Sequence, residues 1–207
     1  MSTETSTPRK SNEIVATNVG KTFGAGPFAK EVIKDCSFTI ESGKLTVMIG
    51  PSGCGKSSLI QLIAGFDQPT SGQITIGGEP IIGPGKDRLV LFQESALFPW
   101  MTTWDNVMYG PRARGEDADA SEAQAEFLLK KVGLEAFRDK YPAQLSGGMQ
   151  RRAELARAMI NKPEVMILDE PFRGLDHMSK ELMWEYYANL YEEDRNTNFF
   201  VTTDIDE

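Results

Sequence analysis

The sequence has few of the residues that bind transition metals or form disulfides. Its 207 residues include one histidine, His177, and two cysteines, Cys36 and Cys54. No C-x-x-C pair occurs, and no cysteines and histidine are grouped at zinc-ligand spacing. Because the two cysteines are far apart in the sequence, we expect free thiols in a reducing compartment.

Long apolar runs and basic clusters are also missing. No stretch approaches the ~18 consecutive apolar residues that span a bilayer, and the polar N-terminal segment MSTETSTPRKSNE has no apolar stretch of the secretory kind. Such a protein would work at a membrane only if another chain held it there. The net charge is −8 and no lysines and arginines form a basic stripe, which argues against nucleic acid as the main ligand.

The composition that remains, 40% apolar and 25% charged, is typical of a packed globular protein. Short, nearly continuous apolar runs predict strands buried on both faces; they lie at residues 44–50, 87–93, 164–170 and 198–203. Helical patterns alternate with them; they lie at residues 56–65, 120–134, 146–160 and 179–194. This alternation predicts an α/β core with a parallel sheet.

The remaining segments extend this core. Residues 1–12 are expected to be a flexible tail, followed by a single domain over residues 13–207. Antiparallel strands are predicted at 13–19 and 36–40, joined by the glycine-rich FGAGPFAKE, with a further strand at 72–78. The mainly helical residues 94–160 are expected to form an inserted subdomain. Within it, Ser121 and Gln124 predict a capping box, and Gly133 is expected to follow the last turn of the same helix.

The segment GPSGCGKSS begins at Gly50 and fits the pattern G-x-x-x-x-G-K-[ST], between a predicted strand and a predicted helix. Glycines let the backbone curl so that N–H groups point at phosphate oxygens, and the helix N-terminus adds a positive dipole end. Lysine can reach the β- and γ-phosphates, and Ser57 can bind Mg²⁺. A glycine-rich turn with a surface lysine is the alternative. The predicted ATP-binding residues here are Gly50, Pro51, Ser52, Gly53, Cys54, Gly55, Lys56, Ser57 and Ser58.

Two carboxylates, Asp169 and Glu170, end the apolar strand VMILDE. Ligands bind at the carboxyl ends of strands in a parallel sheet, and successive side chains of a strand point to opposite faces. We therefore expect different roles: Asp169 would help to hold Mg²⁺, and Glu170 would polarise the attacking water. The alternative is a pair of N-cap residues for the next helix.

Motifs in a fixed order resemble those of the ATP-binding-cassette (ABC) ATPases from about residue 13 to the end. They are the phosphate loop, Gln93 in LFQES, the signature LSGGMQ at 145–150, the strand VMILDEP and RGLD with Leu175 and Asp176. The resemblance implies a P-loop NTPase core with an antiparallel β subdomain and an inserted helical subdomain. It also implies ATP hydrolysis with Mg²⁺, with Gln93 touching Mg²⁺ or the water and Asp176 acting beside it.

The signature residues Ser146, Gly147 and Gly148 open a predicted helix, whose free N–H groups suit an anion. The resemblance implies that they bind, with Gln150, the γ-phosphate of ATP held by a second subunit; an ordinary helix N-cap is the alternative. Phe23 lies where the family places an aromatic that stacks on adenine, and a core aromatic is the alternative.

Thr203 departs from the family pattern. The family normally reads V-T-H-D where this chain reads Val201-Thr202-Thr203-Asp204, so threonine replaces the switch histidine that contacts the γ-phosphate. Threonine donates one hydrogen bond and carries no positive charge. We predict that Glu170, Gln93 and Ser146 suffice for slower hydrolysis; minimal turnover is the alternative. His177, just past RGLD, is expected to be an exposed residue at a helix start.

The resemblance also implies partners. They are a second copy in head-to-tail arrangement or another ABC subunit, transmembrane permease subunits, and indirectly a periplasmic or extracellular solute-binding protein. The chain would then lie at the cytoplasmic face of the cell membrane. The cluster Phe98, Trp100, Met101 and Trp104 is predicted to dock a partner's short helix, with packing inside the helical segment as the alternative.

LFPWMTTWDNV resembles subunits of nitrate, sulfonate, taurine and pyrimidine-precursor importers. The resemblance implies the ATP-binding and ATP-hydrolysing subunit of an importer, which couples dimerisation and hydrolysis to uptake of a small solute. A soluble ABC ATPase of DNA repair or translation and a nucleotide-binding module with weak hydrolysis are the alternatives. Family members continue beyond DIDE, so we expect that a C-terminal portion of the family domain is missing.

Overall fold

The computed structural model describes residues 12–203. The expected tail, residues 1–12, lies outside this range apart from Asn12, and so do residues 204–207. Two sheets lie within the described residues. One is antiparallel with strand order β2-β1-β4-β5; its strands are β1 (Ile14–Phe23), β2 (Lys30–Ile40), β4 (Ser71–Ile76) and β5 (Glu79–Pro80).

The second sheet is parallel, as predicted, with order β3-β8-β7-β6. Its strands are β3 (Leu45–Ile49), β6 (Arg88–Leu91), β7 (Val165–Asp169) and β8 (Thr197–Thr202). The helices are α1 (Lys56–Ala64), α2 (Thr103–Arg114), α3 (Ala118–Lys131), α4 (Gly147–Met159) and α5 (His177–Asp194). Within residues 12–203, 3-10 turns lie at η1 (Gly26–Phe28), η2 (Glu135–Phe137) and η3 (Pro142–Gln144).

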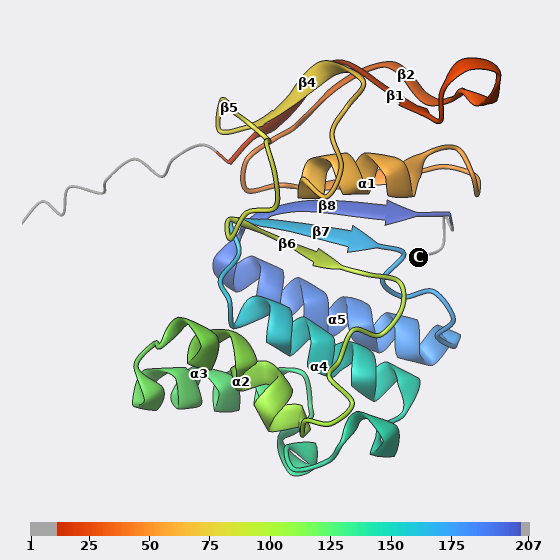
Figure 1. The fold of residues 1–207 in the computed structure, drawn as a ribbon. Helices are drawn as coiled ribbons and strands as arrows, with labels where there is room; N and C mark the ends of the chain where they lie inside the picture. The colour runs from red at the N-terminus through yellow and green to blue at the C-terminus, as the bar shows by residue number, and fades with distance from the viewer. Residues whose placement is uncertain (1–11, 204–207) are drawn as a thin grey trace, which may run out of the picture.

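The elements stack in layers around the parallel sheet. Figure 1 shows the antiparallel sheet above α1, α1 above the parallel sheet, and α4 and α5 on the opposite face, with α2 and α3 outermost. The central strand β7 explains the layering, because alternate side chains enter two different cores: Val165 and Ile167 face α1, and Met166 and Leu168 face α4 and α5. Burial on both faces produces the continuous apolar run seen in the sequence.

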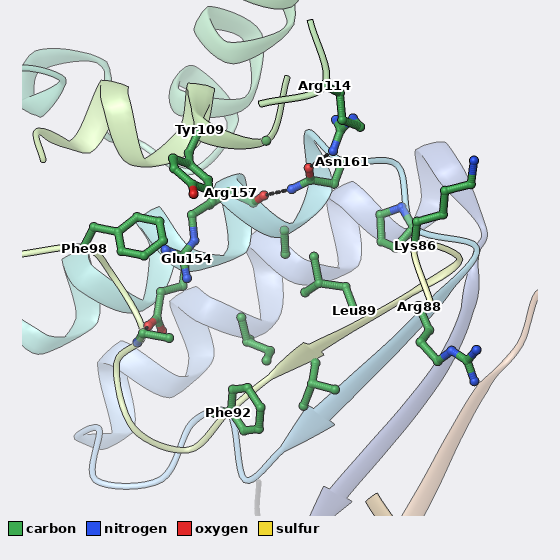
Figure 2. A pocket seen from close by; sticks show the side chains of 16 residues that line it. Lys86, Arg88, Leu89, Phe92, Phe98, Tyr109, Arg114, Glu154, Arg157 and Asn161 are labelled. Atoms are coloured by element: carbon green, nitrogen blue, oxygen red, sulfur yellow. Dashed lines mark hydrogen bonds between the residues drawn. The ribbon is translucent and has the colours of Figure 1, made fainter. Parts of the chain in front are cut away.

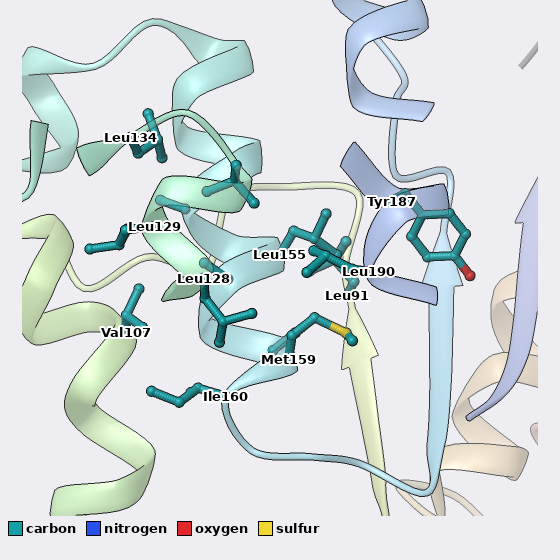
Figure 3. Close-up of a cluster of buried hydrophobic side chains, with 14 of the residues drawn as sticks. Leu91, Val107, Leu128, Leu129, Leu134, Leu155, Met159, Ile160, Tyr187 and Leu190 are labelled. Carbon is teal, nitrogen blue, oxygen red and sulfur yellow. The ribbon is translucent and has the colours of Figure 1, made fainter. Parts of the chain in front are cut away.

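The helical segment and the sheet share one hydrophobic core. Figure 3 shows Val107 of α2, Leu128 of α3 and Leu155 of α4 packed together with Leu91 of β6 and Tyr187 of α5. Leu128 and Leu155 are almost fully buried, and burying such side chains stabilises the fold by about 1.5–3 kcal/mol each. The three helices fall within residues 94–160, but the boundaries of a separate subdomain stay a proposal.

Local corrections concern ends and caps. The strands β1 and β2 are longer than predicted, so only residues 24–29 connect them. The capping box at Ser121 is wrong, because α3 begins earlier, with Asp117 as N-cap accepting from Ala120 N at 2.8 Å. Ser121 is a buried residue inside that helix. Gly133 does follow the last turn of α3, with a φ of 64° that favours glycine.

None of the helices in the described range is both long and apolar enough to cross a bilayer.

Candidate nucleotide site

The sequence motifs meet along one edge of the parallel sheet. Parallel strands end on the same side, where the arrowheads of β6, β7 and β8 point in Figure 1. The register pairs Ile49 with Thr202, Val201 with Asp169, and Leu168 with Leu91. The residues that follow these strand ends therefore lie side by side in the order Gly50, Thr203, Glu170, Gln93.

Backbone hydrogen bonds fix this edge. Gly50 N donates to Thr202 O at 3.3 Å, and Glu170 N donates to Val201 O at 2.8 Å. The two predicted strand-end motifs are thus tied to the strand that carries the switch position. The sheet itself, rather than long side chains, sets where the phosphate loop, the carboxylates and Thr203 lie.

The phosphate loop has the conformation that its glycines predict. Gly53 and Gly55 have φ values of 80° and 100°, and a Cβ on Gly55 would lie 3.1 Å from Val32 O. Lys56, 7% exposed, turns back into the loop, where Nζ donates to Gly50 O at 2.7 Å and Pro51 O at 3.0 Å. The first N–H groups of α1 have no partner within the helix. A loop curled around an ammonium group at a helix N-terminus fits a phosphate chain.

The donor set fits Mg²⁺ only together with phosphates. Ser57 is exposed in the first turn of α1, and Asp169 ends β7. Burial and the charge of Glu170 raise the pKa of Asp169, while Lys56 and Arg151 act in the opposite direction. The described residues contain no group of three or more metal-binding side chains. Mg²⁺ commonly binds through one or two carboxylates and the phosphates of a nucleotide, which matches this sparse set.

Glu170 is buried and is held by Arg173, the first residue of RGLD, to which the motif assigned no role. Its backbone φ is 44°, a left-handed conformation, and it follows the last residue of β7. Arg173 Nη1 lies 2.6 Å from Glu170 Oε2 and 3.5 Å from Gln93 Oε1. One guanidinium nitrogen therefore contacts both the carboxylate and the amide that follow β7 and β6.

A buried ion pair lies beneath Gln93. Arg151 Nη1 is 2.6 Å from Glu154 Oε2, and both side chains are almost inaccessible. Arg151 also donates to Gln93 O at 2.9 Å and, through Nε, to Pro171 O. Glu154 accepts from Ala96 N. The pair joins α4 to the segments that follow β6 and β7, and no motif predicted it.

The signature residues begin α4 as predicted. Ser146 is the N-cap, and its hydroxyl accepts from Met149 N at 3.3 Å. No atom lies within 4 Å of a Cβ built on Gly147, so this end is open. Gln150 differs, because its Nε2 donates to Pro142 O at 2.9 Å and Leu145 O at 3.3 Å. The Gln150 amide thus binds the backbone of the segment that precedes α4 in the same chain. Its role toward a second subunit stays a prediction.

The other predicted site residues lie at element ends. Phe23 is 41% exposed at the end of β1 with Lys21 Nζ 5.0 Å from its ring centroid, so the core alternative is wrong. Asp176 caps α5, and hydrogen bonds from Ser179 lower its pKa. His177 is exposed at the start of α5, as predicted. Thr203 directly follows β8.

A groove opens beside the free edge of β6, between that strand, α2 and α4. Its volume is about 560 Å³. Figure 2 shows Leu89 and Phe92 on the strand side and Phe98, Tyr109 and Arg157 on the helix side. Lys86, Arg88 and Arg114 add positive charge. Glu154, half of the buried ion pair, also lines this groove.

The predicted aromatic cluster divides in two. Phe98 lines the groove and packs against Tyr109 and Trp100 at centroid distances of 4.8 and 5.5 Å, and Trp100 is 69% exposed. Trp104 is buried, with the Arg138 guanidinium 3.9 Å from its ring centroid. For Trp104, packing inside the helical segment is therefore correct and docking is wrong.

Comparisons with known proteins agree with these motifs. The ABC transporter family matches residues 33–173. The nitrate import ATP-binding protein NrtD of Synechococcus elongatus is 44% identical over 91% of this chain and 70% of its own length. The taurine import ATP-binding protein TauB of a Jannaschia species is 40% identical over 86% and 66%. The dimeric structure of MJ0796, a bacterial ABC transporter cassette, superposes with a TM-score of 0.80 at 31% identity, covering 93% of this chain and 88% of that one.

The chain spans about two thirds of the length of these curated relatives. The fold predicted from the motifs is confirmed by the structural match. The match over residues 33–173 and the identity to NrtD together show that the chain belongs to the ABC transporter family.

Proposed function

We propose that this chain is the ATP-binding and ATP-hydrolysing subunit of an ABC transporter that imports a small solute. The observation that carries the proposal is the register of β3, β8, β7 and β6, which aligns the phosphate loop, Thr203, Glu170 and Gln93 on one edge. ATP would bind with its phosphates in the loop 50–58 and Phe23 near the adenine. Ser57, Asp169 and Gln93 would hold Mg²⁺, which neutralises phosphate charge.

Hydrolysis follows from the roles of these groups. A water oxygen attacks the γ-phosphorus, a new P–O bond forms, and the bond from phosphorus to the bridging oxygen of ADP breaks. Glu170 orients the water and receives its proton, and Lys56 stabilises charge on the phosphate oxygens. Thr203 offers one hydroxyl donor beside them.

A second copy, or a paired ABC subunit, completes the site. Ser146, Gly147 and Gly148 form an open, positively polarised helix end. In a head-to-tail pair this end would meet the γ-phosphate bound on the other chain, close to Asp176. The dimeric state of the MJ0796 cassette, a relative with the same fold, supports the formation of a pair.

The groove beside β6 is the surface proposed for the membrane partners. It is lined by apolar and cationic side chains. Its lining residue Phe98 packs against the exposed Trp100. Its lining residue Glu154 pairs with Arg151, which donates to Gln93 O. A short helix of a permease subunit suits such a groove. The chain would then lie peripherally on the cytoplasmic face of the membrane, with a solute-binding protein engaging the permease from the other side. The names of the two relatives support nitrate or taurine, which is a sulfonate, as the solute class.

The test is phosphate release by the whole subunit bound to its permease partners. Glu170→Gln is expected to lower kcat by at least about 10²-fold while ATP binding persists, because the base is lost and the loop is intact. Glu185→Gln, an exposed carboxylate on α5, is the matched control and should behave as wild type. If wild type and Glu170→Gln release phosphate equally slowly, hydrolysis by this chain is excluded.

A nucleotide-binding module with weak hydrolysis is the second candidate, and Thr203 is the observation that favours it. Such a module would bind ATP and dimerise normally. The same assay separates the two candidates, since only the transporter ATPase loses activity with Glu170→Gln. A soluble ABC ATPase outside transport is separated by its failure to co-purify with membrane proteins.

A further inference from the structure

Arg173 is a charged residue next to the reacting groups that the mechanism above does not use. It lies in the turn between β7 and α5, three residues after Glu170. Its Nη1 atom lies 2.6 Å from Glu170 Oε2 and 3.5 Å from Gln93 Oε1. Glu170 follows β7 and Gln93 follows β6. The sheet places these two residues at the same edge, and the Arg173 nitrogen joins their side chains directly.

The exposure of the two partners differs sharply. The Arg173 side chain is 54% exposed, whereas that of Glu170 is 9% exposed. Arg173 is thus the solvent-exposed partner of a buried carboxylate at the strand-end edge, where the attacking water and the γ-phosphate would lie. The backbone of Glu170 is already fixed by its bond to Val201 O. The contact with Arg173 therefore restricts the side chain and sets the direction of its carboxylate.

Other cations near this edge are held by other partners. Lys56 Nζ is bound to loop carbonyls, and Arg151 is buried against Glu154 and backbone oxygens. Thr203, which follows the neighbouring strand β8, cannot be charged. Arg173 differs from these groups, because it is a solvent-exposed cation whose guanidinium contacts the acid Glu170 directly.

We propose that Arg173 is a positioning residue for ATP hydrolysis. It holds Glu170 toward Gln93 and the attacking water, and it supplies beside the γ-phosphate the positive charge that Thr203 lacks. The inference rests on the proposed ATPase function of this edge.

The first test compares Arg173→Ala, Arg173→Lys and wild type in the whole subunit with its partners, measuring kcat and KM for Mg-ATP. Loss of a residue that orients a reacting group costs on the order of 10- to 100-fold in activity, and we expect this loss in kcat with KM within about twofold. Lysine should restore part of kcat, because it keeps the charge but not the planar fork. Arg112→Ala is the matched control, since Arg112 makes a 2.7 Å pair with Asp105 and is 51% exposed.

Two further readouts separate positioning from general packing. Guanidinium ion at millimolar concentration should raise kcat of Arg173→Ala and leave Arg112→Ala unchanged. Introducing Thr203→His should shrink the loss caused by Arg173→Ala, because the histidine supplies a replacement charge. A kcat for Arg173→Ala equal to that of the control, a loss confined to KM, or an equal loss in both Thr203 backgrounds would overturn the proposal.

Failure of this inference is distinguishable from failure of the proposed function. If Glu170→Gln abolishes phosphate release while Arg173→Ala does not change it, the edge hydrolyses ATP and Arg173 has no part in it. If Glu170→Gln has no effect either, the proposed function itself is wrong.

Discussion

Two regions of the molecule place their functional groups by different means. One is the strand-end edge, where the parallel strands end; the other is the junction, the buried Arg151–Glu154 pair of α4 with its backbone partners. At the edge, strand register and backbone hydrogen bonds set the positions of Gly50, Glu170 and Thr203. At the junction, the buried Arg151–Glu154 pair ties α4 to the carbonyl oxygens of Gln93 and Pro171. The difference teaches that side-chain changes at the edge should alter rate with little loss of stability, and that changes at the junction should alter stability first.

The largest effect is expected from a variant that breaks the buried ion pair of the junction. Glu154→Ala leaves the Arg151 charge buried without its carboxylate, and breaking such a pair destabilises a protein by about 3–5 kcal/mol. Urea unfolding should show this loss. The double variant Arg151→Met with Glu154→Leu should recover part of it, because no charge is left buried, although Gln93 O, Pro171 O and Ala96 N lose their side-chain partners. A single variant as stable as wild type would contradict the structural role of the pair.

The next largest effect is expected from a substitution of Thr203 at the strand-end edge, where we expect a change in rate and not in stability. Thr203→His restores a ring that can carry charge beside the γ-phosphate. A transition-state contact of this kind is worth about 10²–10³ in rate, so we expect kcat to rise by a factor toward the lower end of that range. The free energy of unfolding should stay near that of wild type. Unchanged or lower phosphate release would show that Thr203 is not the element that limits turnover.

A smaller effect concerns Asp169. Burial and the charge of Glu170 raise its pKa above 3.8, so the folded state binds this proton more tightly than the unfolded state does. This contribution to stability is full below that pH and is lost as pH rises through the folded pKa. Asp169→Asn should therefore melt at a higher temperature than wild type at pH 7, and the difference should shrink in acid. Thermal scans at two pH values check this, and an equal or lower melting temperature at pH 7 would contradict it.

The smallest effect on the chain itself is expected from Trp100→Ala. Trp100 is 69% exposed, so its removal should leave both melting temperature and basal ATP binding unchanged. Co-purification with permease subunits should fall, because the groove loses an aromatic neighbour. Trp104→Ala provides the contrast, since that ring is buried and its loss should destabilise the chain.

The parallel sheet and the phosphate loop were predictable because their signals are local. A continuous apolar run, a glycine-rich loop and a helix start follow one another in GPSGCGKSS and its flanks. The helix α2 was missed, since Gly110 and Pro111 lower its helix propensity. Burial of Val107 and Met108 in the core shared with α4 overrides that preference.

Sequence motifs predicted which residues form the candidate site, but they did not predict the side-chain contacts between them. Motif positions identified Glu170 and Gln93, yet the Arg173 bridge between them joins residues 80 positions apart. The Arg151–Glu154 pair escaped prediction for a similar reason: its partners at Ala96 and Pro171 come from other segments. Such long-range contacts depend on strand order, which the sequence pattern alone does not determine.

The central claim is that the strand ends of β3, β8, β7 and β6 form one ATP site that a second chain completes. The most direct measurement is an experimental structure of the Glu170→Gln subunit with Mg-ATP. We predict phosphates in the loop 50–58, Mg²⁺ at Ser57 and Asp169, and Ser146 of a second copy against the γ-phosphate. ATP bound instead in the groove beside Arg114 and Arg157, or a site closed by one chain alone, would contradict the account.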